Sequence, residues 1–218
     1  KLPGIIRAMR ECIIQHGGEI HFDTKIESLS PFHPLTPSSS HPLTLSPIIL
    51  AIGHSAHETY RMLFDEGVAL QTKGFAMGVR VEHPQTLINR LMYHTTDVSY
   101  VGNASYSLVT QVEGRGVYSF CMCPGGHIVP ATSSTDACVV NGMSASHRNS
   151  PYANSGIVVQ INPEDISAIS NQQSAISDAL SGLRLQEYVE HLAFVHGGAP
   201  AIAPAQRLAD FVRGKRSA

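Results

Sequence analysis

The turn Gly53-His54-Ser55 is the first group of residues whose position suggests chemistry. It follows a continuous apolar run, residues 48–52, and precedes a helical pattern. A helix N-terminus at the end of a buried strand presents unpaired backbone N–H groups and a positive dipole end. Anions, including dinucleotides, bind at such turns. The sequence therefore predicts a ligand-binding turn here, with an ordinary capped turn as the alternative.

Two cysteines, Cys121 and Cys123, stand two residues apart at the end of a predicted strand. Alternate residues of a strand point the same way, so the thiols could form a strained redox pair or supply two thiolates. The other two cysteines are single, which disfavours a structural zinc and leaves buried, unreactive thiols as the alternative. The following pair, Gly125 and Gly126, indicates that the backbone passes close to a ligand or to another chain segment.

A third group is the polar loop at residues 141–149, with Asn154 and Ser155 beyond it. Its amides, hydroxyls and Arg148 suit a polar or anionic small molecule, although an Asx-rich turn is equally consistent with the composition. Arg80 is a further candidate for contact with an anion. His54 and His57 are spaced for a shared metal, but twelve histidines make close pairs expected by chance, so a metal enzyme ranks last.

The elements that position these residues follow from hydrophobic periodicity. Two helices are predicted at residues 2–16 and 55–67, the second opened by a capping box of Ser55 and Glu58. Two strands are predicted at residues 19–29 and 48–52, separated by a Pro- and Ser-rich loop at 30–47. Short alternating strands then predict an antiparallel module, at residues 75–81, 106–112, 117–122, 128–132, 139–143 and 157–161. Hairpin-length turns are predicted at residues 113–116 and 124–126, and helices at 84–92 and 173–195, the latter interrupted or bent near Gly182.

Composition narrows the classes of function. The 218 residues are 43% hydrophobic and 15% charged, as in one large globular domain or two small ones. The formal charge of −2 gives no basic field, so no nucleic acid partner is expected. No apolar run is long enough to span a bilayer, and four irregularly spaced cysteines suit a reducing cytoplasm. No Gly-x-Ser-x-Gly motif supports a serine hydrolase.

Several strings of residues resemble one family. They include Ala51-Ile-Gly-His-Ser-Ala56, Phe75-Ala-Met-Gly-Val-Arg-Val-Glu-His-Pro-Gln85, Gly114-Arg-Gly-Val-Tyr-Ser-Phe-Cys-Met-Cys-Pro-Gly-Gly126 and Val140-Asn-Gly-Met-Ser144. This pattern, dense up to about residue 163, resembles bacterial FAD-dependent dehydrogenases. These are NAD(P)/FAD-dependent oxidoreductases whose distal half is the FAD-dependent protein C-terminal domain.

The resemblance implies an α/β plus β-rich chain, with an inserted, mostly antiparallel β domain and C-terminal helices. Residues 1–74 would be a partial Rossmann-like FAD-binding domain, and residues 75–218 an inserted substrate-type domain, the FAD-dependent protein C-terminal domain. FAD is the implied cofactor, with NAD(P)H as a candidate electron donor and an unidentified small molecule as substrate. The implied catalytic residues are Cys121, Cys123 and Arg148. The implied cofactor-binding residues are Lys25, Ile26, Ala51, Ile52, Gly53, His54, Ser55, Gly125, Gly126 and Asn154.

The sequence also departs from the family pattern. It contains no Gly-x-Gly-x-x-Gly turn for the pyrophosphate and no returning carboxy-terminal segment. We therefore expect this chain to be an internal fragment of a cytoplasmic oxidoreductase. Its expected partners are the missing amino- and carboxy-terminal parts of its own fold. Such a fragment would bind FAD weakly by itself. The alternative is a non-catalytic binding or interaction module left by truncation of such a flavoprotein.

Overall fold

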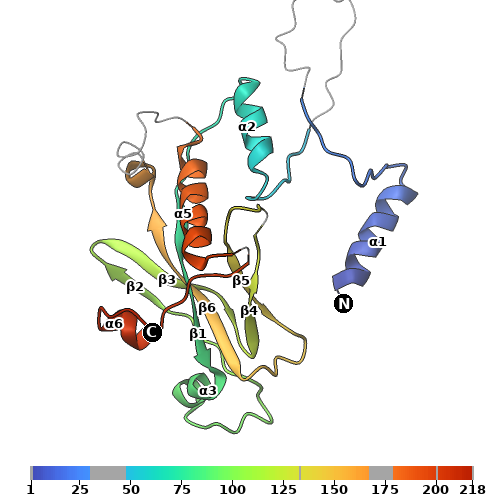
Figure 1. The fold of residues 1–218 in the computed structure, drawn as a ribbon. Helices are drawn as coiled ribbons and strands as arrows, with labels where there is room; N and C mark the ends of the chain where they lie inside the picture. The colour runs from blue at the N-terminus through green and yellow to red at the C-terminus, as the bar shows by residue number, and fades with distance from the viewer. Residues whose placement is uncertain (1, 30–47, 133, 167–178, 200, 218) are drawn as a thin grey trace, which may run out of the picture. The chain divides into compact units, whose positions relative to one another are not determined.

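The computed structural model describes residues 2–29, 48–132, 134–166, 179–199 and 201–217 (Figure 1). They form two compact units, Lys1–Val68 and Ala69–Ala218. The mixture of helices with antiparallel sheets agrees with the predicted α/β plus β-rich class. The predicted identities of the two domains stay predictions, and each unit is described by itself.

The first unit contains helices α1 (Leu2–Gln15) and α2 (His57–Asp65). The predicted first helix is confirmed, and it ends as expected at a glycine in the left-handed region, Gly17 with φ 81°. No residue of α1 is buried. Its apolar stripe, which includes Ile5 and Ile13, is about half exposed, at 56% and 48%.

The two strands predicted in the first unit, residues 19–29 and 48–52, are wrong. Both segments lack a ladder partner among the described residues, and an isolated extended segment cannot satisfy its backbone groups as a strand does. The first segment is held by side chains of α2 instead. Lys25 forms an ion pair with Glu58, and the Leu29 N–H donates to the Glu66 carboxylate at 3.0 Å. A Rossmann-like arrangement is therefore not confirmed, and the predicted loop 30–47 lies outside the described residues.

The predicted capping box of α2 is also wrong. The residue at the N-cap is Ala56, and no side chain caps the helix. Glu58, which the capping box requires to turn back onto the preceding backbone, binds Lys25. The ion pair thus replaces the local hydrogen bond.

The second unit is built on a four-stranded antiparallel sheet in the order β1–β6–β3–β2 (Figure 1). Its strands are β1 (Phe75–Pro84), β2 (Val109–Val112), β3 (Arg115–Cys123) and β6 (Tyr152–Ile161). A separate two-stranded sheet pairs β4 (Gly126–Pro130) with β5 (Val140–Ser144). The predicted strands of this region are confirmed with shifted ends.

The two predicted turns have different outcomes. Residues Glu113 and Gly114 link β2 to β3 as a two-residue hairpin loop, and both have positive φ, as a twisted hairpin requires. The turn at residues 124–126 is not a hairpin, because β3 and β4 belong to different sheets. The chain leaves the first sheet there and starts the second, so this turn sets the position of the β4–β5 pair.

The second unit also contains the helices α3 (Gln85–Tyr93), α5 (Ser181–Gly197) and α6 (Leu208–Val212), and the described residues 163–166 after β6 are helical too. Helix α3 begins directly after Pro84 as predicted. The predicted helix 173–195 is observed from Ser181 onward, and residues 173–178 of that prediction lie outside the described residues. Gly182 lies in its first turn. Helix α6 lies among the predicted C-terminal helices, for which the sequence predicts no bounds beyond residues 173–195.

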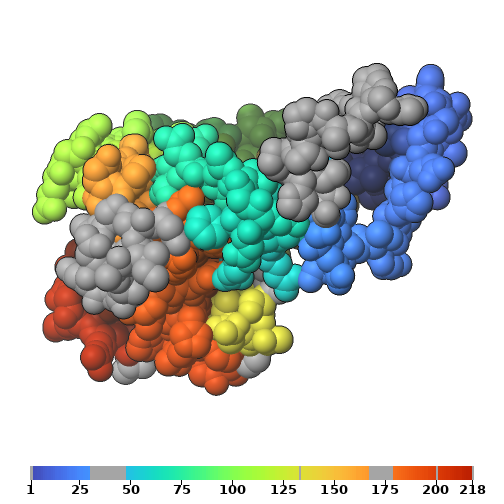
Figure 2. Space-filling model, turned by 90° about the horizontal axis from the view of Figure 1, so that it is seen from above, coloured from blue at the N-terminus to red at the C-terminus, as the bar shows by residue number. Residues whose placement is uncertain are grey.

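Helix α5 is tied to the segment that joins β4 to β5. The Cys138 N–H donates to the Glu190 carbonyl at 2.9 Å, and the His191 ring is hydrogen-bonded to the Asp136 carbonyl at 3.0 Å. Figure 2 shows this segment, in yellow, beside the orange helix. Across the residues that the structure describes, no helix combines the length and the apolar character needed to cross a membrane.

One ion pair joins β3 to the segment after β6. The Arg115 guanidinium donates to both oxygens of Asp165, at 2.5 and 2.6 Å, and Arg115 Nη1 also lies 3.5 Å from the Gln160 carbonyl. This pairing lowers the pKa of Asp165 to about 2 from its usual 3.8. The Asp165 carboxylate also accepts the Asn162 N–H at 2.9 Å.

We expect Asp165→Asn to lower the midpoint of urea unfolding at pH 7. The stabilisation is present above the usual pKa of 3.8 and disappears as the pH falls toward about 2, because the native carboxylate is then protonated as well. The difference between the variant and the parent should therefore shrink over that interval. The control is Glu164→Gln, which removes a neighbouring exposed charge. A difference that is constant with pH would contradict the prediction.

Candidate functional site

The candidate site surrounds Asn154, which is fully buried in β6. In the sheet register Asn154 lies opposite Glu82 of β1 and Cys123 of β3. Cross-strand partners share one face of a sheet, and the diagonal neighbour Arg80 lies on that same face. Arg80 Nη1 donates to Asn154 Oδ1 at 2.5 Å. The central strand thus holds a charged group of its neighbour against a buried amide.

Arg80 also connects two further strands to this point. Its Nη1 atom donates to the Cys121 carbonyl at 3.2 Å, and its Nη2 atom lies 3.4 Å from Asn141 Oδ1. One guanidinium therefore joins β1, β3, β5 and β6. The planar fork of arginine supplies several donors in fixed directions, which lysine does not.

Two polar groups of this cluster are not fully paired. Within the described ranges, no carboxylate forms an ion pair with Arg80. The Nδ2 atom of Asn154 is buried and has no hydrogen-bond acceptor. A buried donor without an acceptor costs about 1–3 kcal/mol, so its presence needs a reason. Both groups, a cation and an N–H donor, favour an acceptor or an anion as the ligand.

The β4–β5 pair closes over this cluster at Gly142. A Cβ atom placed on Gly142 would lie 2.0 Å from Arg80 Nη1 and 2.3 Å from Asn154 Oδ1. Only a glycine lets β5 approach this closely. The Gly142 N–H donates to Asn141 Oδ1 at 2.8 Å, which orients the amide that faces Arg80.

The two cysteines of the site lie at an irregularity of β3. The register with β6 shifts between Phe120 and Cys123, and Cys121 has a φ of 49°. Cys121 is exposed and Cys123 is buried, and both thiols are free. The Cys123 thiol donates to the Cys121 carbonyl at 3.4 Å. Burial, followed by the proximity of Cys121, raises the pKa of Cys123, while Arg80 acts in the opposite direction.

The predicted residues Gly125, Gly126 and Arg148 are placed by packing. A Cβ atom on Gly125 would lie 1.8 Å from the Arg148 carbonyl, and one on Gly126 would lie 2.5 Å from the Met143 carbonyl. The glycine pair was predicted to lie close to a ligand or to another chain segment, and the structure shows close approach to another chain segment. The Arg148 carbonyl also accepts a hydrogen bond from Asn103 Nδ2 at 2.6 Å. Roles for these residues toward a ligand stay predictions.

Sequence reasoning missed two buried amides of α3, Gln85 and Asn89, each 3% exposed. Gln85 Nε2 donates to Asn89 Oδ1 at 2.8 Å, and Gln85 Oε1 accepts the Gly125 N–H at 2.7 Å. Polar residues four apart on a short helix are usually read as its solvent face. The only signal for them was the string Glu-His-Pro-Gln, which ends at Gln85.

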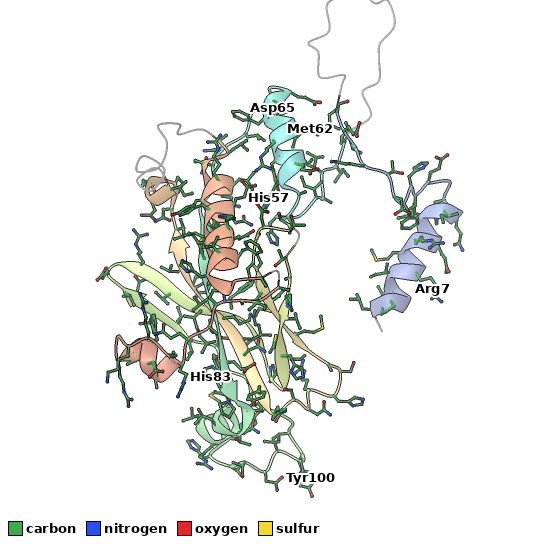
Figure 3. The ribbon with its side chains drawn as sticks, viewed as in Figure 1. Arg7, His57, Met62, Asp65, His83 and Tyr100 are labelled. Carbon is green, nitrogen blue, oxygen red and sulfur yellow. The ribbon has the colours of Figure 1, made fainter. Side chains whose placement is uncertain are left out.

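Another polar chain lies on the opposite face of the sheet. The His83 ring is hydrogen-bonded to the Tyr106 hydroxyl at 2.7 Å, and that hydroxyl donates to Ser155 Oγ at 3.0 Å. Burial lowers the pKa of His83. Figure 3 shows His83 beside α3, where Ile88, Ala104 and Ala153 form a small core. Adjacent residues of β6, Asn154 and Ser155, therefore serve opposite faces.

The remaining predicted residues belong to the first unit. The ion pair with Glu58 raises the pKa of Lys25, and Ile26 is 63% exposed. The predicted turn includes Gly53 with a φ of 68°, whose carbonyl accepts the Tyr60 hydroxyl at 2.9 Å. In the next two residues, the His54 Nε2 atom lies 3.4 Å from the Ser55 Oγ atom. Contacts of these residues, and of Ala51 and Ile52, with a cofactor stay predictions.

Among the residues with described positions, no group of three His, Cys, Asp or Glu side chains is arranged to hold a metal ion.

We expect Gly142→Ala to destabilise the second unit by roughly 1–3 kcal/mol, because the new methyl group must displace Arg80 or Asn154. The matched control is Gly116→Ala on β3. Its Cβ atom would meet nothing closer than Gln160 Oε1 at 4.0 Å, so the change should stay within about 0.5 kcal/mol. Urea unfolding followed by circular dichroism measures both. Equal effects would show that the space over Arg80 is not limiting.

Comparison with known proteins places this geometry in a family. A protein of Clostridium beijerinckii named "Uncharacterized protein" is 40% identical over 222 residues, which cover 99% of this chain and 40% of that protein. The chain thus spans about two fifths of the length of this relative. Residues 74–218, which include β1, β3, β5 and β6, match the family described as FAD-dependent protein, C-terminal domain-like. Since this match covers more than half of the sequence, the chain belongs to that family of FAD-dependent proteins.

Proposed function

We propose that this chain is part of a flavin-dependent oxidoreductase of the dehydrogenase type, acting on a small molecule. The observation that carries the proposal is the match of residues 74–218 to a family of FAD-dependent proteins. We also propose that other parts of the protein complete a Rossmann-like fold. NAD(P)H is the proposed electron donor.

The residues of the second unit fit a flavin in one respect. Arg80 carries a charge that no described carboxylate balances, and Asn154 holds a buried donor without an acceptor. The pyrimidine edge of a flavin presents carbonyl oxygens and a ring nitrogen, which accept hydrogen bonds and take up negative charge. The Asn154 Nδ2 atom is itself buried, so the contact that we propose with the flavin is made by Arg80.

When bound, the flavin would supply the hydride or electron transfer, and the protein would supply orientation and charge. Arg80 would hold negative charge at the face formed by β1, β3 and β6. The Cys121 carbonyl and the Asn141 amide fix the direction of its guanidinium. In the first unit, Lys25 and Ile26 would lie near the adenine, and the turn of residues 51–55 would contact the cofactor.

The direct test is the absorption spectrum of the protein produced from its complete reading frame. We expect a yellow protein with a flavin spectrum that bleaches on addition of NADH or NADPH. The same measurement on the 218-residue chain shows how much FAD this segment binds by itself. A complete protein that is colourless and does not bind added FAD would overturn the proposal and favour the alternative, a non-catalytic interaction module.

A second test concerns the charge of Arg80. In the flavin-loaded complete protein, we expect Arg80→Gln to lower the midpoint potential of the flavin by about 30 mV, which corresponds to roughly 1.4 kcal/mol for two electrons. A positive charge favours the negative charge that a flavin gains on reduction, so its removal makes reduction harder. Arg90→Gln, a change of an exposed arginine on α3, is the control for net charge. Equal potentials for the two variants would exclude Arg80 from the flavin environment.

A further inference from the structure

We propose that Cys121 and Cys123 form a thiol–disulfide exchange site whose substrates are low-molecular-weight disulfides. Cys121 is the attacking thiol and Cys123 the resolving thiol. This activity goes beyond the proposed flavin chemistry and does not depend on it, because the electrons come from the two thiols and go to the disulfide substrate.

The backbone of β3 brings the two cysteines into a suitable arrangement. In a regular strand, Cα atoms two residues apart are separated by about 6.4–6.8 Å, at the upper end of the roughly 4.4–6.8 Å that a disulfide needs. The left-handed conformation at Cys121 and the register shift at that point break the extended geometry. A non-glycine residue with a positive φ is uncommon, and such residues cluster at functional sites. The Cys123 thiol is folded back onto residue 121, 3.4 Å from its carbonyl oxygen.

The surroundings divide the work between the two thiols. Cys121 is exposed and can meet a disulfide in solution, while Cys123 is only 8% exposed and can react only with a neighbour. The Arg80 guanidinium, which donates to the Cys121 carbonyl, lies beside both residues. It favours the thiolate form of Cys123 against burial, which raises the pKa of that thiol.

The exchange proceeds in two steps. The Cys121 thiolate attacks one sulfur of the substrate RSSR, so that a Cys121–SR bond forms, the RS–SR bond breaks and RS⁻ leaves. The Cys123 thiol loses its proton to water, and its thiolate attacks the Cys121 sulfur. This attack forms the Cys121–Cys123 disulfide and releases the second RS⁻. The two cysteines are oxidised by two electrons, and the substrate is reduced to two thiols.

The other two cysteines lack this arrangement. Cys12 is exposed on α1, where its sulfur lies 3.8 Å from His16 Nδ1. Cys138 is buried beside α5, to which its backbone N–H is bonded. Neither has a neighbouring cysteine in sequence, so they supply the internal comparison for reactivity.

The test treats the 218-residue chain with oxidised glutathione in a Cys12→Ser background and measures adducts by intact mass and peptide mapping. We expect the background protein to lose two thiols and to accumulate no glutathione adduct. With Cys123→Ser added, we expect one adduct at Cys121 that persists. With Cys121→Ser added instead, we expect no adduct and no loss of thiols.

Two outcomes would overturn the proposal. One is a persistent adduct at Cys121 in the background protein, since Cys123 would then not resolve it. The other is the absence of any reaction at Cys121 in both the background and the Cys123→Ser protein. Circular dichroism checks that each variant folds, and Cys123→Ala replaces Cys123→Ser if the buried hydroxyl prevents folding.

Arg80→Gln provides a second measurement in which both cysteines are retained. Without the guanidinium, the thiolate form of Cys123 loses the neighbour that favours it against burial, so the resolving step should slow by roughly threefold. Arg80→Lys should recover part of that rate. An unchanged rate in Arg80→Gln would overturn the assignment of Arg80 to the exchange site. Because none of these experiments involves a flavin, their failure is distinguishable from failure of the proposed function.

Discussion

The hydrogen bond from Arg80 to Asn154 is the interaction on which the second unit depends. Asn154 is fully buried in the central strand β6, so an amide oxygen there must be given a donor. Arg80 supplies that donor from β1, and its remaining N–H groups then need acceptors of their own. The structure supplies them from the Cys121 carbonyl and the Asn141 amide. One buried polar residue thus dictates the positions of three other strands.

This requirement explains features that packing alone would not produce. The chain cannot place β5 over a guanidinium unless its side chain is absent, which accounts for Gly142. The Cys121 carbonyl reaches Arg80 at the point where β3 loses its regular register with β6. A regular strand directs its carbonyls along the sheet, toward its ladder partners. The bulge that exposes Cys121 and buries Cys123 is therefore linked to the need of the Arg80 guanidinium for acceptors.

The sequence predicted the second unit better than the first. Alternation of apolar and polar residues indicates a strand with one buried face, and most strands of the second unit show it. Residues 75–81 alternate, and they pair in an actual ladder with residues 155–161, so the pattern and the structure have the same cause. Residues 48–52 show a run typical of a buried strand, but Ile49 is 88% exposed and the segment pairs with no described strand. A run of apolar residues indicates that burial of these side chains is favourable, but it does not identify the element that packs against them. Likewise Ser55 and Glu58 satisfied the capping pattern, yet Lys25, distant in sequence, took the carboxylate.

The candidate site was predictable in its members and not in its contacts. Cys121, Cys123 and Asn154 were each singled out by residue type, but their meeting depends on register, which a single sequence does not encode locally. The assumption that residues two apart point the same way fails at Cys121, because a positive φ rotates that residue out of the alternation. That failure carries functional meaning. A strand that followed the rule would expose or bury both thiols together, whereas this one exposes the first and buries the second beside a guanidinium.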